Sequence, residues 1–193
     1  MGERARPSEF PGLFWRDRRG AAALEFAIVS LPFTTLLLFL VEIGYDFFAQ
    51  VSLDYGLQTA ARQVQIGAAQ GASNAADFQT TYLCPALSGL LPCSSVSVNI
   101  KPITTDYYAD TTVSATLPTD KSGKLDTSGY TYCPGKPRQL MLVQAIYTSP
   151  SFIAALVPAM ATTTASGFVH VTLSSAAFIN ENYPVTSASP AGC

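Results

Sequence analysis

The segment that decides the fold is RRGAAALEFAIVSLPFTTLLLFLV, which occupies residues 18–41. Between Ala21 and Val41 it contains one charged residue, Glu25. The stretch from Leu24 to Val41 has 18 residues. As a helix that rises about 1.5 Å per residue, it would measure about 27 Å, close to the thickness of the hydrocarbon core of a bilayer. The sequence therefore predicts a transmembrane helix near the N-terminus.

Charges on either side of this run predict its orientation. Three basic residues precede it and three acidic residues follow it: Arg16, Arg18 and Arg19, then Glu42, Asp46 and Asp54. Because basic residues favour the cytoplasmic side, we expect a single-pass membrane protein with a cytoplasmic N-terminus and with residues beyond about 42 outside. The run is longer than the apolar core of a cleaved signal peptide. A signal peptidase also needs small residues before the bond it cuts, but the first alanine after the run, Ala49, directly follows two phenylalanines. An uncleaved signal anchor is one interpretation.

The composition excludes several classes of function. Hydrophobic residues make up 48 % of the 193 residues and charged residues 12 %, about half of the charged share usual for a soluble domain. A formal net charge of -2 provides no basic field for nucleic acid. The single histidine, His170, excludes an HExxH zinc site, and the glycine-lysine pair within residues 129–137 lacks the spacing of a phosphate loop. We expect no enzyme activity, no cofactor and no metal.

Beyond the membrane the pattern predicts an α+β protein. Polar residues recur every four positions from Glu42 to Arg62, which indicates that the helix continues to a linker within residues 43–74. Residues 75–193 then form a small antiparallel sheet of about four strands, expected at 95–101, 111–117, 140–147 and 168–173. In the last strand, alternation places Val169, Val171 and Leu173 inward and leaves His170 and Thr172 outward.

Four cysteines in this outer part suit an oxidising compartment such as the bacterial periplasm. They are Cys84, Cys93, Cys133 and Cys193. Four cysteines allow three pairings, and a free or intermolecular Cys193 is a further alternative.

The start of the apolar run carries a more specific pattern. Five residues after Gly20, a carboxylate at Glu25 stands just inside the membrane boundary and is followed by Phe26. Such a carboxylate costs several kcal/mol unless it is partnered. Arg18 or Arg19 could reach it in an intact chain, or an ammonium freed at Ala21 could pair with it if the chain were cut after Gly20.

The junction resembles the processing motif of type IV prepilins of the Flp/Tad (tight adherence) class. The stretch RRGAAALEFAIVSLPFTTLLLFLVEIGYDFFAQVSLDYGLQTAARQV is similar to TadE/TadF-like pseudopilins, which carry a folded domain after the helix. The ending Asn-Glu-Asn-Tyr at 180–183 resembles an Asn-Glu-Pro-aromatic ending of that family.

The resemblance implies a type IV pilin-like minor pilin that takes part in assembling a Tad pilus. Residues 1–20 would then be a cytoplasmic leader, 21–42 the transmembrane helix and 75–193 a periplasmic domain. A prepilin peptidase would cut between Gly20 and Ala21, and Glu25 and Phe26 would act in assembly. The implied partners are the inner membrane, the Tad assembly platform and other pilin-like subunits, namely a TadE/TadF partner and the Flp major pilin.

The resemblance also favours one disulfide pairing. A short loop containing Gly89 can close between Cys84 and Cys93, and the family carries a similar pair. Cys133 and Cys193 are then left to pair with each other. The alternative to the pilin interpretation is an uncleaved, membrane-anchored periplasmic scaffold or binding domain.

Overall fold

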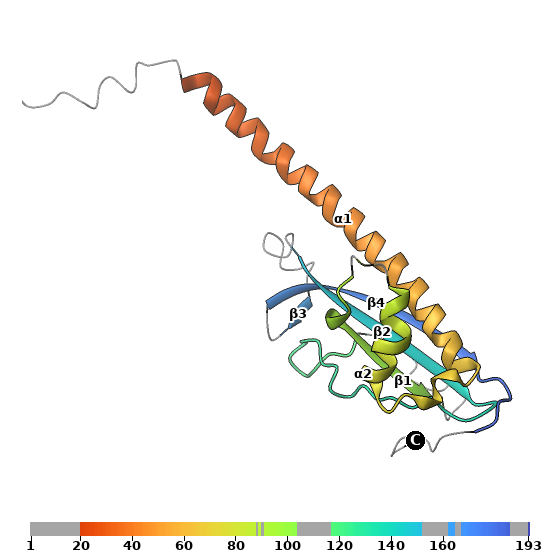
Figure 1. Cartoon of the computed structure of the whole chain (residues 1–193). Helices are drawn as coiled ribbons and strands as arrows, with labels where there is room; N and C mark the ends of the chain where they lie inside the picture. Colours follow the sequence, from red (N-terminus) through yellow and green to blue (C-terminus); the bar gives the residue numbers. More distant parts are fainter. Residues whose placement is uncertain are drawn as a thin grey trace, which may run out of the picture. The chain divides into compact units, whose positions relative to one another are not determined.

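The structure is a computed structural model that describes residues 20–87, 89, 91–103, 117–151, 162–164, 167–185 and 193. It divides into two compact units, residues 1–41 and residues 42–193. The second unit holds all of the sheet together with the second part of the long helix (Figure 1).

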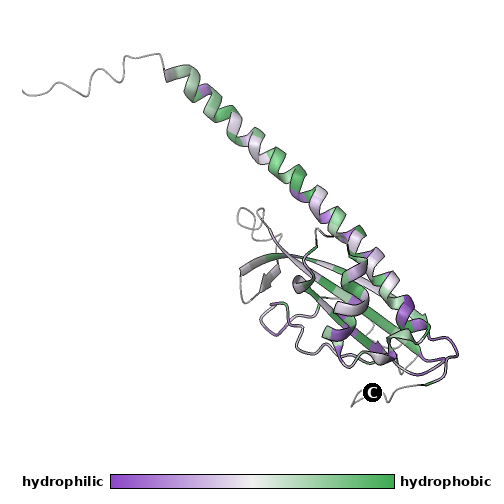
Figure 2. Cartoon of the chain, viewed as in Figure 1, coloured by the Kyte–Doolittle hydropathy of each residue, from purple (hydrophilic) through white to green (hydrophobic). Residues whose placement is uncertain are grey.

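The longest element is α1, a single helix of 45 residues from Ala21 to Gln65 that continues through Pro32. Figure 2 shows apolar residues concentrated in its N-terminal part and in the strands. The helix is long enough and apolar enough to cross a membrane. In its most apolar stretch of 18 residues, only 6 % is buried within the protein. The sequence-based prediction of a helix with these properties is confirmed.

The sheet has the strand order β1-β2-β4-β3, and all neighbouring strands are antiparallel. Its three long strands are β1 (Val96–Pro102), β2 (Leu140–Pro150) and β4 (Gly167–Ile179), while β3 (Thr162–Thr164) has three residues. The α+β class and three of the expected strands are confirmed. The strand expected at 111–117 lies outside the described residues. The expected count of about four holds only when the short β3 is included.

The core lies between α1 and one face of the sheet. Leu53, Leu57 and Val64 of α1 are almost fully buried against alternate residues of β1 and β2. Those strand residues are Val96, Val98, Ile100, Met141, Val143, Ala145 and Tyr147. Alternate residues of the two strands face α1, whereas β2 is buried on both of its faces from Met141 to Tyr147, as expected for a central strand.

A short irregular segment completes the same core. It contains the 3₁₀ turn Ala68–Gly71, α2 (Ala75–Phe78) and a π-helical turn Gln79–Leu83. Asn74 caps α2 by accepting a hydrogen bond from the Asp77 backbone N–H, and Phe78 and Leu83 are fully buried. Two short helical turns therefore bring these side chains into the core.

The free edge of β1 is covered by the segment that contains Thr131. The Ile100 N–H donates to the Thr131 carbonyl at 2.8 Å, and the Cys133 N–H donates to the Ile100 carbonyl at 2.8 Å. On the sheet face away from α1, the Asn99 side chain bonds to Gln144 at 3.2 Å and accepts from the Thr131 N–H at 3.0 Å. These contacts give the buried Asn99 side chain hydrogen-bond partners.

The expected facing of β4 is wrong. Thr172 lies opposite Tyr147 in the sheet, and Leu173 lies opposite Ile146. His170 and Thr172 therefore point toward α1, and Thr172 is 4 % exposed. Val171 and Leu173 are half-buried on the other face. The predicted alternation is present in β4, but its polar residues face α1 and its apolar residues face away. The reason is that the part of α1 beside β4 presents polar side chains to the sheet.

Replacing Leu57 tests the position of the core. Leu57→Ala removes a fully buried side chain and should lower the free energy of unfolding by about 2–5 kcal/mol. Chemical denaturation of the full chain in micelles, followed by near-ultraviolet circular dichroism, measures the change. Val51→Ala, on the exposed side of the same helix, is the matched control and should change it by less than about 0.5 kcal/mol. Equal effects of the two variants would contradict this packing.

Candidate assembly surface

The predicted processing junction coincides with the start of α1. Gly20 directly precedes the helix and Ala21 is its first residue. Glu25 and Phe26 both lie on the exposed surface of the helix, and Phe26 is 73 % exposed. Among the described residues, no ion pair involves Glu25. Arg16, Arg18 and Arg19 lie outside the described residues.

The part of α1 that follows the apolar run has an inverted polarity. Ile43, Phe47, Val51 and Tyr55, spaced by four residues, are between 54 % and 73 % exposed. Glu42, Asp46, Gln50 and Asp54, with the same spacing, are half-buried. The apolar row therefore faces away from the domain and the polar row toward it, whereas a surface helix ordinarily buries its apolar face.

Polar contacts join the inward row to the end of the sheet. Ser151 donates a hydrogen bond to Glu42, and the hydroxyls of Tyr45 and Tyr147 lie 2.7 Å apart. Asp46 Oδ1 lies 3.1 Å from His170 Nδ1. Further along the helix, Gln50 Nε2 lies 3.1 Å from Asp54 Oδ1 and 3.4 Å from the Leu173 carbonyl oxygen.

Burial changes the acidity of two groups in this cluster. It raises the pKa of the Asp46 carboxyl, and Glu42 raises it further, whereas His170 lowers it. Burial also raises the pKa of the Tyr147 hydroxyl, and the hydrogen bond with Tyr45 acts in the same direction. Both shifts mean that the anionic form is disfavoured in this environment.

Two shallow hollows, of about 370 and 430 Å³, lie beside the apolar row, between α1 and the turn at residues 84–87. Tyr55 and Ala86 line both hollows. None of the lining side chains is charged: Val51, Ser52, Tyr55, Thr59, Gln63, Thr81, Tyr82, Pro85, Ala86 and Leu87. The turn approaches the helix closely at Gly56, where a Cβ atom would lie 2.7 Å from Leu87 Cδ2. The surface next to the row is therefore neutral.

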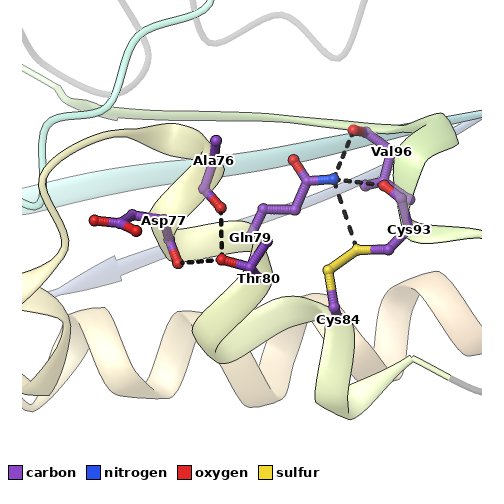
Figure 3. Close-up of a disulfide and its surroundings, with 7 residues drawn as sticks. All are labelled: Ala76, Asp77, Gln79, Thr80, Cys84, Cys93 and Val96. Carbon is purple, nitrogen blue, oxygen red and sulfur yellow. Dashed lines mark hydrogen bonds between the residues drawn. A yellow bond between two sulfur atoms is a disulfide. The ribbon is translucent and has the colours of Figure 1, made fainter.

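A disulfide holds this turn in place (Figure 3). Cys84 is bonded to Cys93, with their Cα atoms 5.7 Å apart. Gln79 Nε2 donates to the carbonyls of Cys93 and Val96, at 2.6 and 2.9 Å. Figure 3 shows this side chain reaching across from the helical turn to the start of β1. The disulfide and Gln79 together tie the turn to the sheet.

The second disulfide joins Cys133 to Cys193, with Cα atoms 5.5 Å apart. This is the pairing that the sequence analysis favoured. Because Cys133 belongs to the segment that covers the edge of β1, the bond connects the last residue of the chain to that edge.

The Asn-Glu-Asn-Tyr ending, to which we assigned no role from the sequence, ties β4 to the end of α1. Asn180 Nδ2 lies 3.0 Å from the carbonyl oxygens of Pro134 and Lys136 and 2.9 Å from the Tyr183 hydroxyl. Glu181 pairs with Arg62 at 2.6 Å, and its N–H donates to the Gln65 carbonyl. At Gly67, with φ of 80°, a Cβ atom would lie 2.5 Å from the Tyr183 ring. Glycine is thus required there both by the left-handed backbone and by the ring.

The described residues contain no group of three or more His, Cys, Asp or Glu side chains that could hold a metal ion. Across that part of the chain, His170 contacts a carboxylate, and all four cysteines are in disulfides.

The chain thus combines an apolar N-terminal helix with an antiparallel sheet. Comparison with protein families gives the particular relationship: residues 20–62, which are 43 of the 193 residues, match the family described as TadE-like protein. This match confirms that the N-terminal segment is similar to the TadE-like family. Searches of curated proteins and of solved structures gave no match.

We expect the neighbouring residues Asn180 and Glu181 to contribute unequally to the stability of the domain. Asn180→Ala removes a buried amide with three hydrogen-bond partners and should destabilise the domain by about 1–3 kcal/mol. Glu181→Ala breaks an ion pair whose side chains are about half exposed, so the loss should stay below about 1 kcal/mol. Chemical denaturation of both variants in micelles measures the difference. A larger effect at Glu181 would show that the ion pair, and not the amide, holds the tail.

Proposed function

We propose that the protein is a TadE-like minor pilin or pseudopilin that takes part in assembly of a bacterial Tad pilus. The observation that carries the proposal is the outward apolar row Ile43–Phe47–Val51–Tyr55, on the helix that matches the TadE-like family. These side chains follow the membrane-spanning stretch, in a part of the chain that would lie in water. Exposed contiguous apolar surface of this kind marks a site of association.

The binding surface fits the side of another pilin-like helix. A row with a spacing of four residues forms a ridge that can enter the groove of a neighbouring helix. The hollows beside the row are lined by uncharged side chains, so an apolar helical partner can approach without burying an unpaired charge. A TadE/TadF partner or the Flp major pilin would supply such a helix.

Processing would complete the subunit at its N-terminal end. A prepilin peptidase would cut between Gly20 and Ala21, directly before the first residue of α1. The freed Ala21 ammonium would then pair with Glu25 of the same or a neighbouring subunit, which offsets the desolvation of the carboxylate and sets the axial register. The exposed position of Glu25 on an apolar helix is compatible with such a partner.

The topology follows the charge distribution. The N-terminus would lie in the cytoplasm and the unit from residue 42 onward in the periplasm, where two disulfides are stable. The subunit would act through its surfaces at the inner membrane and the Tad assembly platform, with no catalytic function and no cofactor. The second candidate, an uncleaved anchored scaffold, shares the membrane helix and the disulfides but predicts an intact leader.

N-terminal sequencing of the membrane-purified protein separates the two candidates. With the prepilin peptidase present, we expect the chain to start at Ala21, and without the peptidase at Met1. Gly20→Ile, which blocks the small position before the bond, should keep the start at Met1, while Ala22→Ser is the control that should be cut normally. A Met1 start in a strain that processes its other prepilins would favour the scaffold.

Piliation of cleaved variants tests the two assembly surfaces. Phe47→Asp introduces a charge into the outward row, and Glu25→Ala removes the register carboxylate. Because burying an unpaired charge costs several kcal/mol, we expect Phe47→Asp to reduce surface pili at least about tenfold. Gln58→Asp adds the same charge at an exposed position of α1 outside the row and should leave pili unchanged.

Both test variants should still start at Ala21, which shows that they reach the membrane and are processed. Normal piliation in Phe47→Asp would overturn the role of the row. Normal piliation in Glu25→Ala would overturn the pairing with the freed ammonium.

A further inference from the structure

We propose that the outward apolar row binds a second copy of this chain that is displaced along the helix by about two turns. Ile43 and Phe47 form the projecting part of the contact, which we call the knob. The receiving part is the smaller hollow, of about 370 Å³, between Val51, Tyr55 and the turn at residues 84–87. The contact rests on the proposed function of the row and adds the identity and the offset of one partner.

The knob is apolar surface that the domain itself does not use. Phe47 is 73 % exposed and Ile43 is 58 % exposed. In α1 the buried core begins at Ala49, so neither side chain is needed for packing of the domain. Covering both side chains removes a contiguous apolar projection from water, which is the main favourable contribution to association.

The hollow is uncharged and is formed before any partner arrives. Its lining consists of Val51, Ser52, Tyr55, Ala86 and Leu87. Leu87 belongs to the core and is 8 % exposed, and the disulfide between Cys84 and Cys93 holds the turn in place (Figure 3). Because these walls are already ordered, binding of an aromatic side chain between them costs little conformational entropy.

The knob and the hollow face different directions. Phe47 and Tyr55 are eight residues apart, which corresponds to about 12 Å along the helix and a rotation of about 80°. A contact that joins two different patches is heterologous, and each outermost copy keeps one patch unfilled. A third copy can bind in the same way, so the contact builds an open helical row of copies and not a closed dimer.

The membrane sets the direction of the copies and the moment at which they meet. Copies inserted in the same orientation have parallel helices, as the offset requires. The apolar stretch Leu24–Val41, about 27 Å long, only just spans the hydrocarbon core, so two copies anchored at equal depth cannot differ by about 12 Å. The contact therefore forms when one copy has moved outward relative to its neighbour, as when subunits are assembled one after another.

A direct contact between two rows at equal depth is the alternative geometry. It would place Phe47 of one copy against Phe47 of the other and would leave both hollows unfilled. The two geometries differ in what a pair of defective copies can do together. Only in the offset geometry can one copy supply the knob while the other supplies the hollow.

Association of the purified full chain in micelles tests the proposal, because helices in a micelle can shift along their axes. Phe47→Asp removes the knob, and Ala86→Trp fills the hollow; neither residue belongs to the buried core cluster. Analytical ultracentrifugation should show dimers and larger species for the parent, and association at least about tenfold weaker for each variant alone. An equimolar mixture of the two variants should recover dimers but no larger species.

Matched controls use an exposed position of α1 outside both patches. Gln58→Asp and Gln58→Trp introduce the same two side chains there and should associate as the parent does. Near-ultraviolet circular dichroism and retention of both disulfides show that each variant is folded. Should Ala86→Trp fail to fold, a photoreactive phenylalanine analogue in place of Phe47 decides the question, with cross-links to residues 85–87 of another copy as the expected result.

A mixture that associates as weakly as its two components would overturn the offset contact. Cross-links from position 47 to position 47 would overturn it equally. A parent that is monomeric at every concentration would overturn the choice of a second copy, whereas the row keeps its proposed function as long as Phe47→Asp reduces pili. Normal piliation of Phe47→Asp together with knob-dependent association in micelles would instead contradict the proposed function alone.

Discussion

The rest of the structure depends on the packing of one helical face against one sheet face. Leu53, Leu57 and Val64 meet the alternating apolar residues of β1 and β2, and this contact fixes both the register of the strands and the rotation of α1 about its axis. Once this rotation is set, the direction in which every other residue of the helix points is set as well. The outward apolar row and the inward polar row are consequences of that single contact.

The inverted polarity of α1 beyond the membrane-spanning stretch connects the fold to the proposed function. A helix that places Phe47 and Tyr55 in water and Asp46 against the sheet is suboptimal for an isolated domain. Apolar exposure becomes favourable when a second helix covers it. The two disulfides and the Asn180 side chain tie other parts of the domain together.

Much of the fold and part of the candidate site follow from local pattern. The apolar run predicted α1 because its length and composition match a bilayer, and Val96, Val98 and Ile100 predicted β1 through their alternation. The junction at Gly20 and Glu25 stays a prediction from their spacing and from the family resemblance. The facing of β4 was predicted wrongly because alternation defines two faces without saying which one meets the helix, and here β4 pairs its polar residues with the polar row of α1. The role of Asn180 could not be predicted, since its partners at 134 and 136 are distant in sequence.

The long apolar helix and the α+β domain behind it can be predicted from the residues alone, because hydrophobic period and charge placement act over a few neighbouring residues. The exposed side of α1, the contact of His170 with Asp46 and the docking of the Asn-Glu-Asn-Tyr segment on the end of the helix are set by packing of the whole domain. Each of these depends on contacts between residues more than a hundred positions apart or on a rotation fixed by the whole core. Such contacts leave no periodic signal in the chain, and packing of the complete domain is what selects them.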